Sequence, residues 1–154
     1  MAPRSSNELL HIDLRSVGRA RIRASYVKPA IRKAQRLVRT TKPLELTVVF
    51  TDRKVIRALN RRHRGINAPT DVLSFSYPPD VRTAPWAGEI VICVPQARAQ
   101  AKQYGHSLLK EITLLAVHGF LHIVGFDHAT QRQATRMRRL ENSVLGMSGS
   151  RTES

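Results

Sequence analysis

The chain has little of three things: cysteine, long hydrophobic runs and acidic residues. Its single cysteine, Cys93, cannot form an internal disulfide, which favours a reducing compartment over a disulfide-stabilised secreted scaffold. No apolar run approaches the roughly 20 residues of a transmembrane helix, and the start, "MAPRSSNELLH", lacks the apolar region of a signal peptide. We therefore expect a cytoplasmic protein, with an organellar location as the alternative.

The shortage of acids leaves a strongly basic protein. The 154 residues include 26 Lys and Arg against 11 Asp and Glu, a formal charge of +15, and most of the excess lies towards the two ends. Such a charge favours polyanionic partners. Nucleic acid is the better match than a membrane surface, because the basic segment 19–40 has few bulky apolar anchors.

Hydrophobic periodicity predicts a single α+β domain over residues 1–146, followed by a flexible tail, 147–154. The expected order is βαβαββααα, with a mixed four-stranded sheet and about five helices. The expected strands are 9–16, 44–50, 68–77 and 88–94. The expected helices are 19–40, 53–63, about 95–104, about 107–124, and a last helix that starts at the capping sequence "TQRQ", 130–133.

The first and fourth of these helices carry further expectations. In 19–40, Pro29 predicts a kink or a restart, and the spacing predicts one buried face made by Ile22, Tyr26, Ala30, Ala34 and Leu37. The segment 107–124 is apolar almost all round, as in a buried helix. Ser107 suits its N-cap, and Gly125 suits the left-handed residue that ends it.

Three histidines interrupt this apolar segment, in "HGFLHIVGFDH", 118–128. His118 and His122 are four residues apart and so share one helix face, and His128 follows the reversal at Gly125. Three nitrogen donors with a fourth position open to water are typical of a catalytic zinc site. Core histidines are the alternative, although the neighbouring apolar residues offer them no hydrogen-bond partners. Asp127 is either an acceptor that orients one ligand or a turn former.

The same spacing occurs in metzincin peptidases, H-E-x-x-H-x-x-G-x-x-H. Those enzymes have a glutamate as general base directly after the first histidine. This chain has Gly119 at that position, which has no side chain to take a proton. The sequence therefore argues against a peptidase.

Three blocks together resemble the YbeY family of metal-dependent endoribonucleases. They are "HGFLHIVGFDH", "LNRRHRGINAPTDVLSF" (59–75) and "GEIVICV" (88–94), and they fall in the family's order. The resemblance extends over roughly 9–146. Two positions depart from the family's pattern: His63 stands where an aromatic is usual, and Glu89 where aspartate is usual.

The resemblance implies cleavage of single-stranded RNA with one Zn²⁺ per chain, in maturation of the 3′ end of small-subunit rRNA and in ribosome quality control. It places Arg64 in the active cleft, where a guanidinium can clamp a phosphate and stabilise its developing charge. The implied partners are single-stranded RNA, rRNA and the ribosome or its small subunit, with no membrane. The candidate RNA contacts are Arg61, Arg62, Thr70, Asp71 and Ser74.

Several points stay open in the sequence. Asp71 equally suits a turn, and the basic helices 19–40 and 53–64 are expected to form a track for the RNA backbone. No general base is evident, and either water or the 2′-hydroxyl can be the nucleophile. The main alternative is a zinc-stabilised RNA-binding or ribosome-assembly factor with little catalysis of its own, and a peptidase ranks third. The oligomeric state is open.

Overall fold

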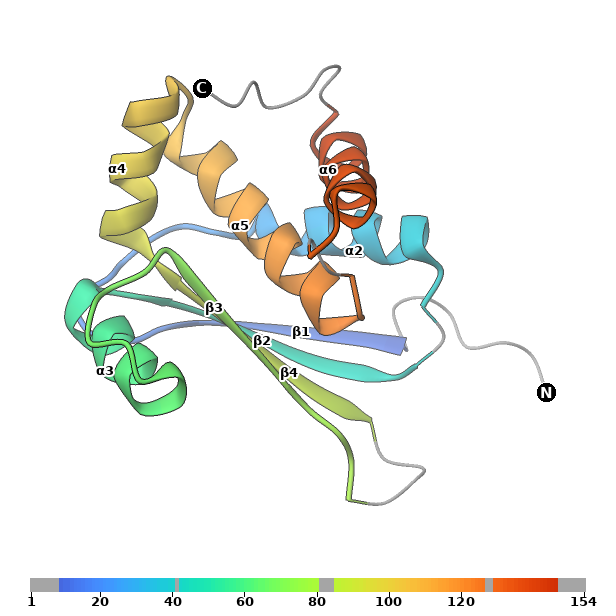
Figure 1. Ribbon diagram of the computed structural model, residues 1–154, viewed down its shortest axis with the longest axis horizontal. Coiled ribbons are helices and arrows are strands. Elements are labelled where there is room, and N and C mark those ends of the chain that lie inside the picture. The colour runs from blue at the N-terminus through green and yellow to red at the C-terminus, as the bar shows by residue number, and fades with distance from the viewer. Residues whose placement is uncertain (1–8, 41, 81–84, 127–128, 147–154) are drawn as a thin grey trace.

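The computed structural model describes residues 9–40, 42–80, 85–126 and 129–146 (Figure 1). Over these residues the chain forms four strands and five helices in one α+β domain, in the predicted order. The elements are β1 (Leu10–Ser16), α2 (Val27–Val38), β2 (Leu44–Thr51), α3 (Arg53–Arg64), β3 (Val72–Tyr77), β4 (Trp86–Cys93), α4 (Val94–Tyr104), α5 (Leu108–Ile123) and α6 (Gln131–Leu145). The tail predicted at 147–154 lies outside the described residues.

The sheet is mixed, with strand order β1-β2-β4-β3. Strands β1, β2 and β4 are parallel, with Leu14 opposite Val48 and Val48 opposite Ile90. Strand β3 runs antiparallel to β4 at the edge, with Ser74 opposite Ile90. The carboxyl ends of the three parallel strands therefore meet at one edge of the sheet.

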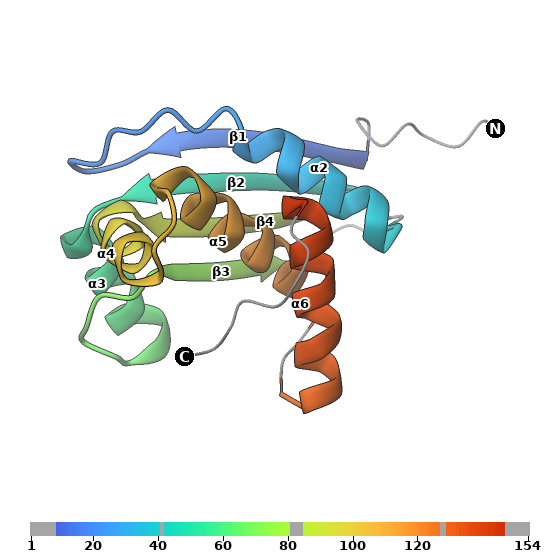
Figure 2. The same cartoon turned by 90° about the horizontal axis from the view of Figure 1, so that it is seen from above.

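The helices cover the two faces of the sheet unequally. Helices α2, α4, α5 and α6 lie on one face and α3 lies on the other (Figures 1 and 2). Side chains alternate between the faces along each strand. In β4, Ile90 and Ile92 enter the large core beneath α5, whereas Val91 and Cys93 enter a small cluster with Ile56 of α3.

Two predicted elements are shorter in the structure than the sequence indicated. The helix expected over 19–40 begins only at Val27, so Pro29 lies in its first turn, where a missing N–H removes no helical hydrogen bond. Leu37, expected to be buried, is 44% exposed. The strand expected over 68–77 begins at Val72, because residues 68–71 form the loop that follows α3.

Side-chain caps hold the starts of α3 and α6. The Asp52 carboxylate accepts a hydrogen bond from the Val55 N–H at the start of α3, and Thr130 and Gln133 form the capping box of α6. Across the four described segments, no helix is both long and apolar enough to cross a membrane.

Candidate functional site

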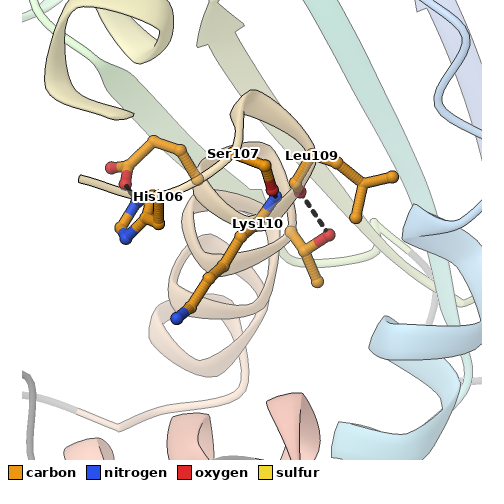
Figure 3. A network of polar contacts seen from close by, with 6 residues as sticks. His106, Ser107, Leu109 and Lys110 are labelled. Carbon is orange, nitrogen blue, oxygen red and sulfur yellow. Dashed lines mark hydrogen bonds and ion pairs between the residues drawn. The ribbon is translucent and has the colours of Figure 1, made fainter. Parts of the chain in front are cut away.

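Helix α5 carries the candidate metal ligands, and polar contacts fix its start (Figure 3). The Ser107 hydroxyl accepts a hydrogen bond from the Lys110 N–H at 3.1 Å, which confirms the predicted N-cap. One turn on, the Thr113 hydroxyl donates to the Leu109 carbonyl. His106 makes a short contact with the buried carboxylate of Glu111. His106 is therefore a structural residue at the opposite end of α5 from the other two histidines.

Gly119 lets α5 approach the sheet closely. A Cβ at this position would lie 2.9 Å from Ile90 Cγ2, closer than side chains pack. The missing side chain thus has a packing reason, in addition to removing the base that a peptidase needs. Close packing on β4 fixes the height of His118 and His122 above the sheet.

The two described histidines of the motif lie side by side, as their spacing predicts. The ring centroids of His118 and His122 are 4.7 Å apart, with the ring planes at 75°. His118 Nδ1 lies 2.7 Å from Glu141 Oε1 of α6. A carboxylate can only accept, so Nδ1 donates this bond and Nε2 keeps its lone pair.

Glu141 is a site residue that the sequence analysis missed. It is 9% exposed, and it lies on the inner face of α6 with Met137 and Val144. The sequence does contain a pattern that indicates burial of Glu141. It follows Met137 by four residues and precedes Val144 by three, so this acid lies in the apolar stripe of the helix. Buried acids are rare unless paired.

The histidines open onto a cavity of about 340 Å³ between α5, the end of α3 and edge strand β3. Its lining includes Arg64, Thr70, Asp71, Ser74, His118 and His122. Two stretches of the chain, 64–74 and 114–122, thus bring the predicted arginine, three predicted RNA contacts and two predicted ligands to one place.

The end of α3 positions Arg64. Gly65 ends the helix with a positive φ of 71°, a conformation that glycine adopts without strain. The buried Asn60 side chain donates to the Ala68 carbonyl at 2.9 Å and so ties the following loop to the helix. Arg64 is exposed, and none of the ion pairs in the described segments involves it.

Asp71 has a structural role within the cavity wall. Its Oδ1 accepts hydrogen bonds from the Val72 N–H at 2.8 Å and from the Thr70 hydroxyl at 3.3 Å. The Gln100 amide, with its nitrogen turned towards the carboxylates, donates to Asp71 Oδ2 at 3.3 Å and to Glu111 Oε1 at 3.1 Å. Asp71 thus makes the turn that the sequence offered as one of two roles, and it also faces the cavity.

Other predicted contacts lie elsewhere. Arg61 and Arg62 line a separate hollow on α3, with Lys54, Arg57 and Asn67. Helices α2 and α3 cover opposite faces of the sheet (Figures 1 and 2), so they do not form the continuous track that was expected; the segment before α2 does meet the start of α3, where the Arg19 N–H donates to Asp52. His63 packs against the Phe75 ring, with centroids 4.8 Å apart, and so makes the ring contact in place of an aromatic residue.

The third predicted ligand, His128, and the neighbouring Asp127 lie outside the described residues. Among the residues that are described, no three His, Cys, Asp or Glu side chains converge as a metal site. The chain does turn back after α5, because Gly125 has a φ of 104° and the Phe126 N–H donates to the Leu121 carbonyl. The Arg136 guanidinium lies 4.8 Å from the centre of the Phe126 ring, which joins this turn to α6.

The His118–Glu141 contact is the observation that bears on a metal. Histidines that bind metals usually donate their other ring nitrogen to a carboxylate or carbonyl, which fixes the tautomer and raises the ligand's basicity. His118 has this arrangement, and the His122 ring lies beside it at the same cavity. The two described imidazoles therefore fit two of the three predicted ligand positions of a zinc site.

The α+β domain thus brings two imidazoles and an arginine to one cavity, and the comparisons with known proteins identify the family. The family model for endoribonuclease YbeY matches residues 15–149. The chain belongs to this family.

Relatives named endoribonuclease YbeY match most of the chain. The protein from Geobacillus kaustophilus is 42% identical over 114 residues, which cover 68% of this chain and 73% of that protein. The protein from Desulfitobacterium hafniense is 38% identical over 131 residues, covering 80% and 83%. The solution structure of TM1509 from Thermotoga maritima has the same fold, with a TM-score of 0.58 over 88% of this chain and 89% of that one, at 23% identity.

Proposed function

We propose that this protein is a zinc-dependent endoribonuclease that cleaves single-stranded RNA at the cavity between α5 and β3. The observation that carries the proposal is the shared cavity of Arg64, His118 and His122. Membership in a family whose members are named endoribonucleases supports the same reaction. The formal charge of +15 supports a polyanionic substrate.

One Zn²⁺ per chain would be held by His118, His122 and the predicted ligand His128. When bound, the ion supplies Lewis acidity and lowers the pKa of a coordinated water. Glu141 would act through His118: by accepting the hydrogen bond from Nδ1 it fixes the tautomer in which Nε2 is the nitrogen able to hold the ion.

Arg64 binds the scissile phosphate. Its guanidinium stands at the cavity with no acid paired to it among the described residues, so its charge is available for a phosphate oxygen. Thr70 and Ser74, on the same wall, offer hydroxyl groups to the sugar or phosphate. Arg61 and Arg62 would contact the strand where it leaves the cavity along the outer side of α3.

We further propose that the substrate is rRNA, at the 3′ end of the small-subunit RNA, and that the protein works on the ribosome or its small subunit. This assignment rests on the family resemblance. The second candidate function is a zinc-stabilised RNA-binding or assembly factor with little catalysis. It is favoured by one observation: the cavity-facing carboxylate of Asp71 is engaged in turn and amide hydrogen bonds, so it is a poor general base.

The test compares wild type, His122→Ala and Arg64→Glu on single-stranded RNA, with zinc content measured for each. We expect wild type to cleave, His122→Ala to lose both zinc and cleavage, and Arg64→Glu to lose cleavage while it keeps zinc. Undiminished cleavage by metal-free His122→Ala would overturn the zinc mechanism. Fully metallated wild type that binds RNA without cleaving it would favour the assembly factor.

A further inference from the structure

A second, strongly basic cavity of about 560 Å³ lies away from the histidines. The segment after β1, the start of α3 and one side of α4 form its walls. Five cationic side chains line it: Arg19, Arg21, Arg53, Arg98 and Lys102. Arg19, Arg21 and Arg53 belong to the two basic segments that the sequence predicted to contact the RNA backbone, whereas Arg98 and Lys102 were not singled out.

Asp52 is the single acid among the described residues that line this cavity, and both of its carboxylate oxygens accept hydrogen bonds from backbone N–H groups. Its Oδ1 accepts from the Val55 N–H at 3.0 Å and its Oδ2 from the Arg19 N–H at 2.9 Å. These two hydrogen bonds lower the pKa of Asp52 below its ordinary value. Gly18 permits the close approach, because a Cβ there would lie 2.4 Å from Asp52 Oδ2 and its φ is +74°.

The five cationic side chains outnumber the acid in this cavity. With Asp52 counted, the lining has five positive groups and one negative group, a formal charge of +4. The Arg53 Nε donates to Gln96 and the Arg21 Nη1 donates to backbone carbonyls, all neutral acceptors. No ion pair recorded for the described segments involves any of the five. Positive charge gathered in a concave site raises the local concentration of anions.

The cavity occupies the position in the fold where open parallel sheets bind ligands. Strand β1 leads to α2 on one face of the sheet and its neighbour β2 leads to α3 on the other (Figures 1 and 2). Where successive connections part to opposite faces, a crevice opens at the carboxyl ends of the strands. Arg19 follows β1, Arg53 follows β2, and α4 follows β4 directly.

We propose that this cavity is a second phosphate-binding subsite, which holds the backbone of the same RNA strand that is cleaved near Arg64. It rests on the proposed RNA-cleaving function. Arg53 and Arg64 are the two ends of α3, about 17 Å apart at 1.5 Å per residue. A single strand whose bases stay stacked at about 3.4 Å per nucleotide, the rise per strand of a duplex, needs roughly five nucleotides to span them. The protein therefore prefers substrates that are long enough to fill both cavities.

The test uses a double charge reversal with a matched control in the full chain. Arg98→Glu/Lys102→Glu alters the cavity, and Lys33→Glu/Arg36→Glu makes the same charge change at exposed positions of α2. Binding of labelled oligothymidylates of two and twelve nucleotides is followed by fluorescence anisotropy over a range of salt. Cleavage of a ribonucleotide tetramer, too short to span both cavities, is measured in parallel, and thermal melting checks that each variant is folded.

We expect the cavity variant to bind the twelve-mer roughly tenfold or more weakly, with the salt slope lower by about 1.4 for two lost contacts at about 0.7 each. The dimer, which has too few phosphates to fill both cavities, loses less affinity than the twelve-mer, and cleavage of the tetramer stays at the control level. Equal twelve-mer binding by cavity and control variants would overturn the subsite. Binding of uridine monophosphate to wild type as tight as that of the twelve-mer would also overturn the subsite, because the cavity would then hold a free nucleotide. Wild type that cleaves no RNA would instead refute the proposed function and leave the anisotropy comparison valid.

Discussion

Helix α3 has a different kind of cavity at each of its ends. At the Arg64 end, one arginine faces two imidazoles, one of them held by the buried carboxylate of Glu141. At the Arg53 end, five cations surround a carboxylate whose oxygens are bonded to the backbone. The two cavities suit two different tasks in the proposed function, cleavage at the Arg64 end and binding of the RNA backbone at the Arg53 end. Breaking a bond needs a few groups fixed by packing and hydrogen bonds, whereas holding a backbone needs mainly summed charge.

His122→Ala should give the largest effect and should affect only the Arg64 end. Loss of a metal ligand removes several kcal/mol of transition-state stabilisation, so we expect RNA cleavage to fall roughly a thousandfold, together with zinc content. Twelve-mer binding should stay near wild type, because the other cavity is intact. The control is His11→Ala, an exposed histidine on β1. A variant that keeps its zinc would remove His122 from the ligand set.

Arg64→Gln tests whether the arginine at this end acts on the reacting phosphate. Removal of one group that stabilises developing charge typically lowers the rate about 10²–10³-fold. We expect that loss in single-turnover cleavage, with zinc content unchanged. Arg36→Gln, on the exposed side of α2, is the matched control. A rise in KM alone, with kcat preserved, would assign Arg64 to general RNA binding, as at the Arg53 end.

Glu141→Ala tests the role of the carboxylate behind His118. Removal of such a partner typically lowers metal affinity or activity about 10–100-fold. We expect weaker zinc binding in a chelator competition, and an intermediate value for Glu141→Gln, whose amide oxygen still accepts from Nδ1. Glu45→Gln, an exposed position on β2, should match wild type. Unchanged zinc affinity with a lower melting temperature would make Glu141 a purely structural residue.

Gly119→Ala tests whether packing sets the position of the histidines. The added Cβ meets Ile90 at 2.9 Å, and overpacking of this kind typically costs about 1–3 kcal/mol. We expect a lower free energy of unfolding in urea, and a loss in the double variant with Ile90→Ala that is smaller than the sum of the two single losses. Additive effects of Gly119→Ala and Ile90→Ala would contradict the contact.

Asp52→Ala should give the smallest effect, at the Arg53 end. The pKa of Asp52 is lowered by hydrogen bonds from the Arg19 and Val55 backbone. A carboxyl with a lowered folded-state pKa stabilises the fold above its unfolded-state value, and this contribution is lost as pH falls through the folded value. The melting temperatures of variant and wild type should therefore differ at neutral pH and converge well below the ordinary value of 3.8. A difference independent of pH would refute this role.

Much of the fold follows from local sequence. Alternating strands, the cap residues Asp52, Ser107 and Thr130, and the i, i+4 spacing of His118 and His122 are local patterns, and the structure has each of them. The helix start at Val27 was misjudged, because the preceding segment is held by tertiary contacts such as the Arg19 N–H to Asp52 bond. Helical spacing alone carries no information on such contacts.

The rest of the site depends on which elements meet. Glu141 reaches His118 only because α6 packs against α5, 23 residues further along the chain. The basic cavity exists only because the connections after β1 and β2 leave on opposite faces of the sheet. Arg61 and Arg64 are three residues apart and yet line different hollows. Composition and spacing do not specify these arrangements.

The most direct test of zinc-dependent cleavage at the Arg64 end is a single titration. Full-length protein is stripped of metal, zinc is added back stepwise, and cleavage of a twelve-nucleotide single-stranded RNA is measured against bound zinc. We expect no cleavage without metal and full activity at one zinc per chain, with His122→Ala inactive throughout. Cleavage by the metal-free protein, or activity that rises equally in His122→Ala, would contradict a catalytic zinc centre at His118 and His122.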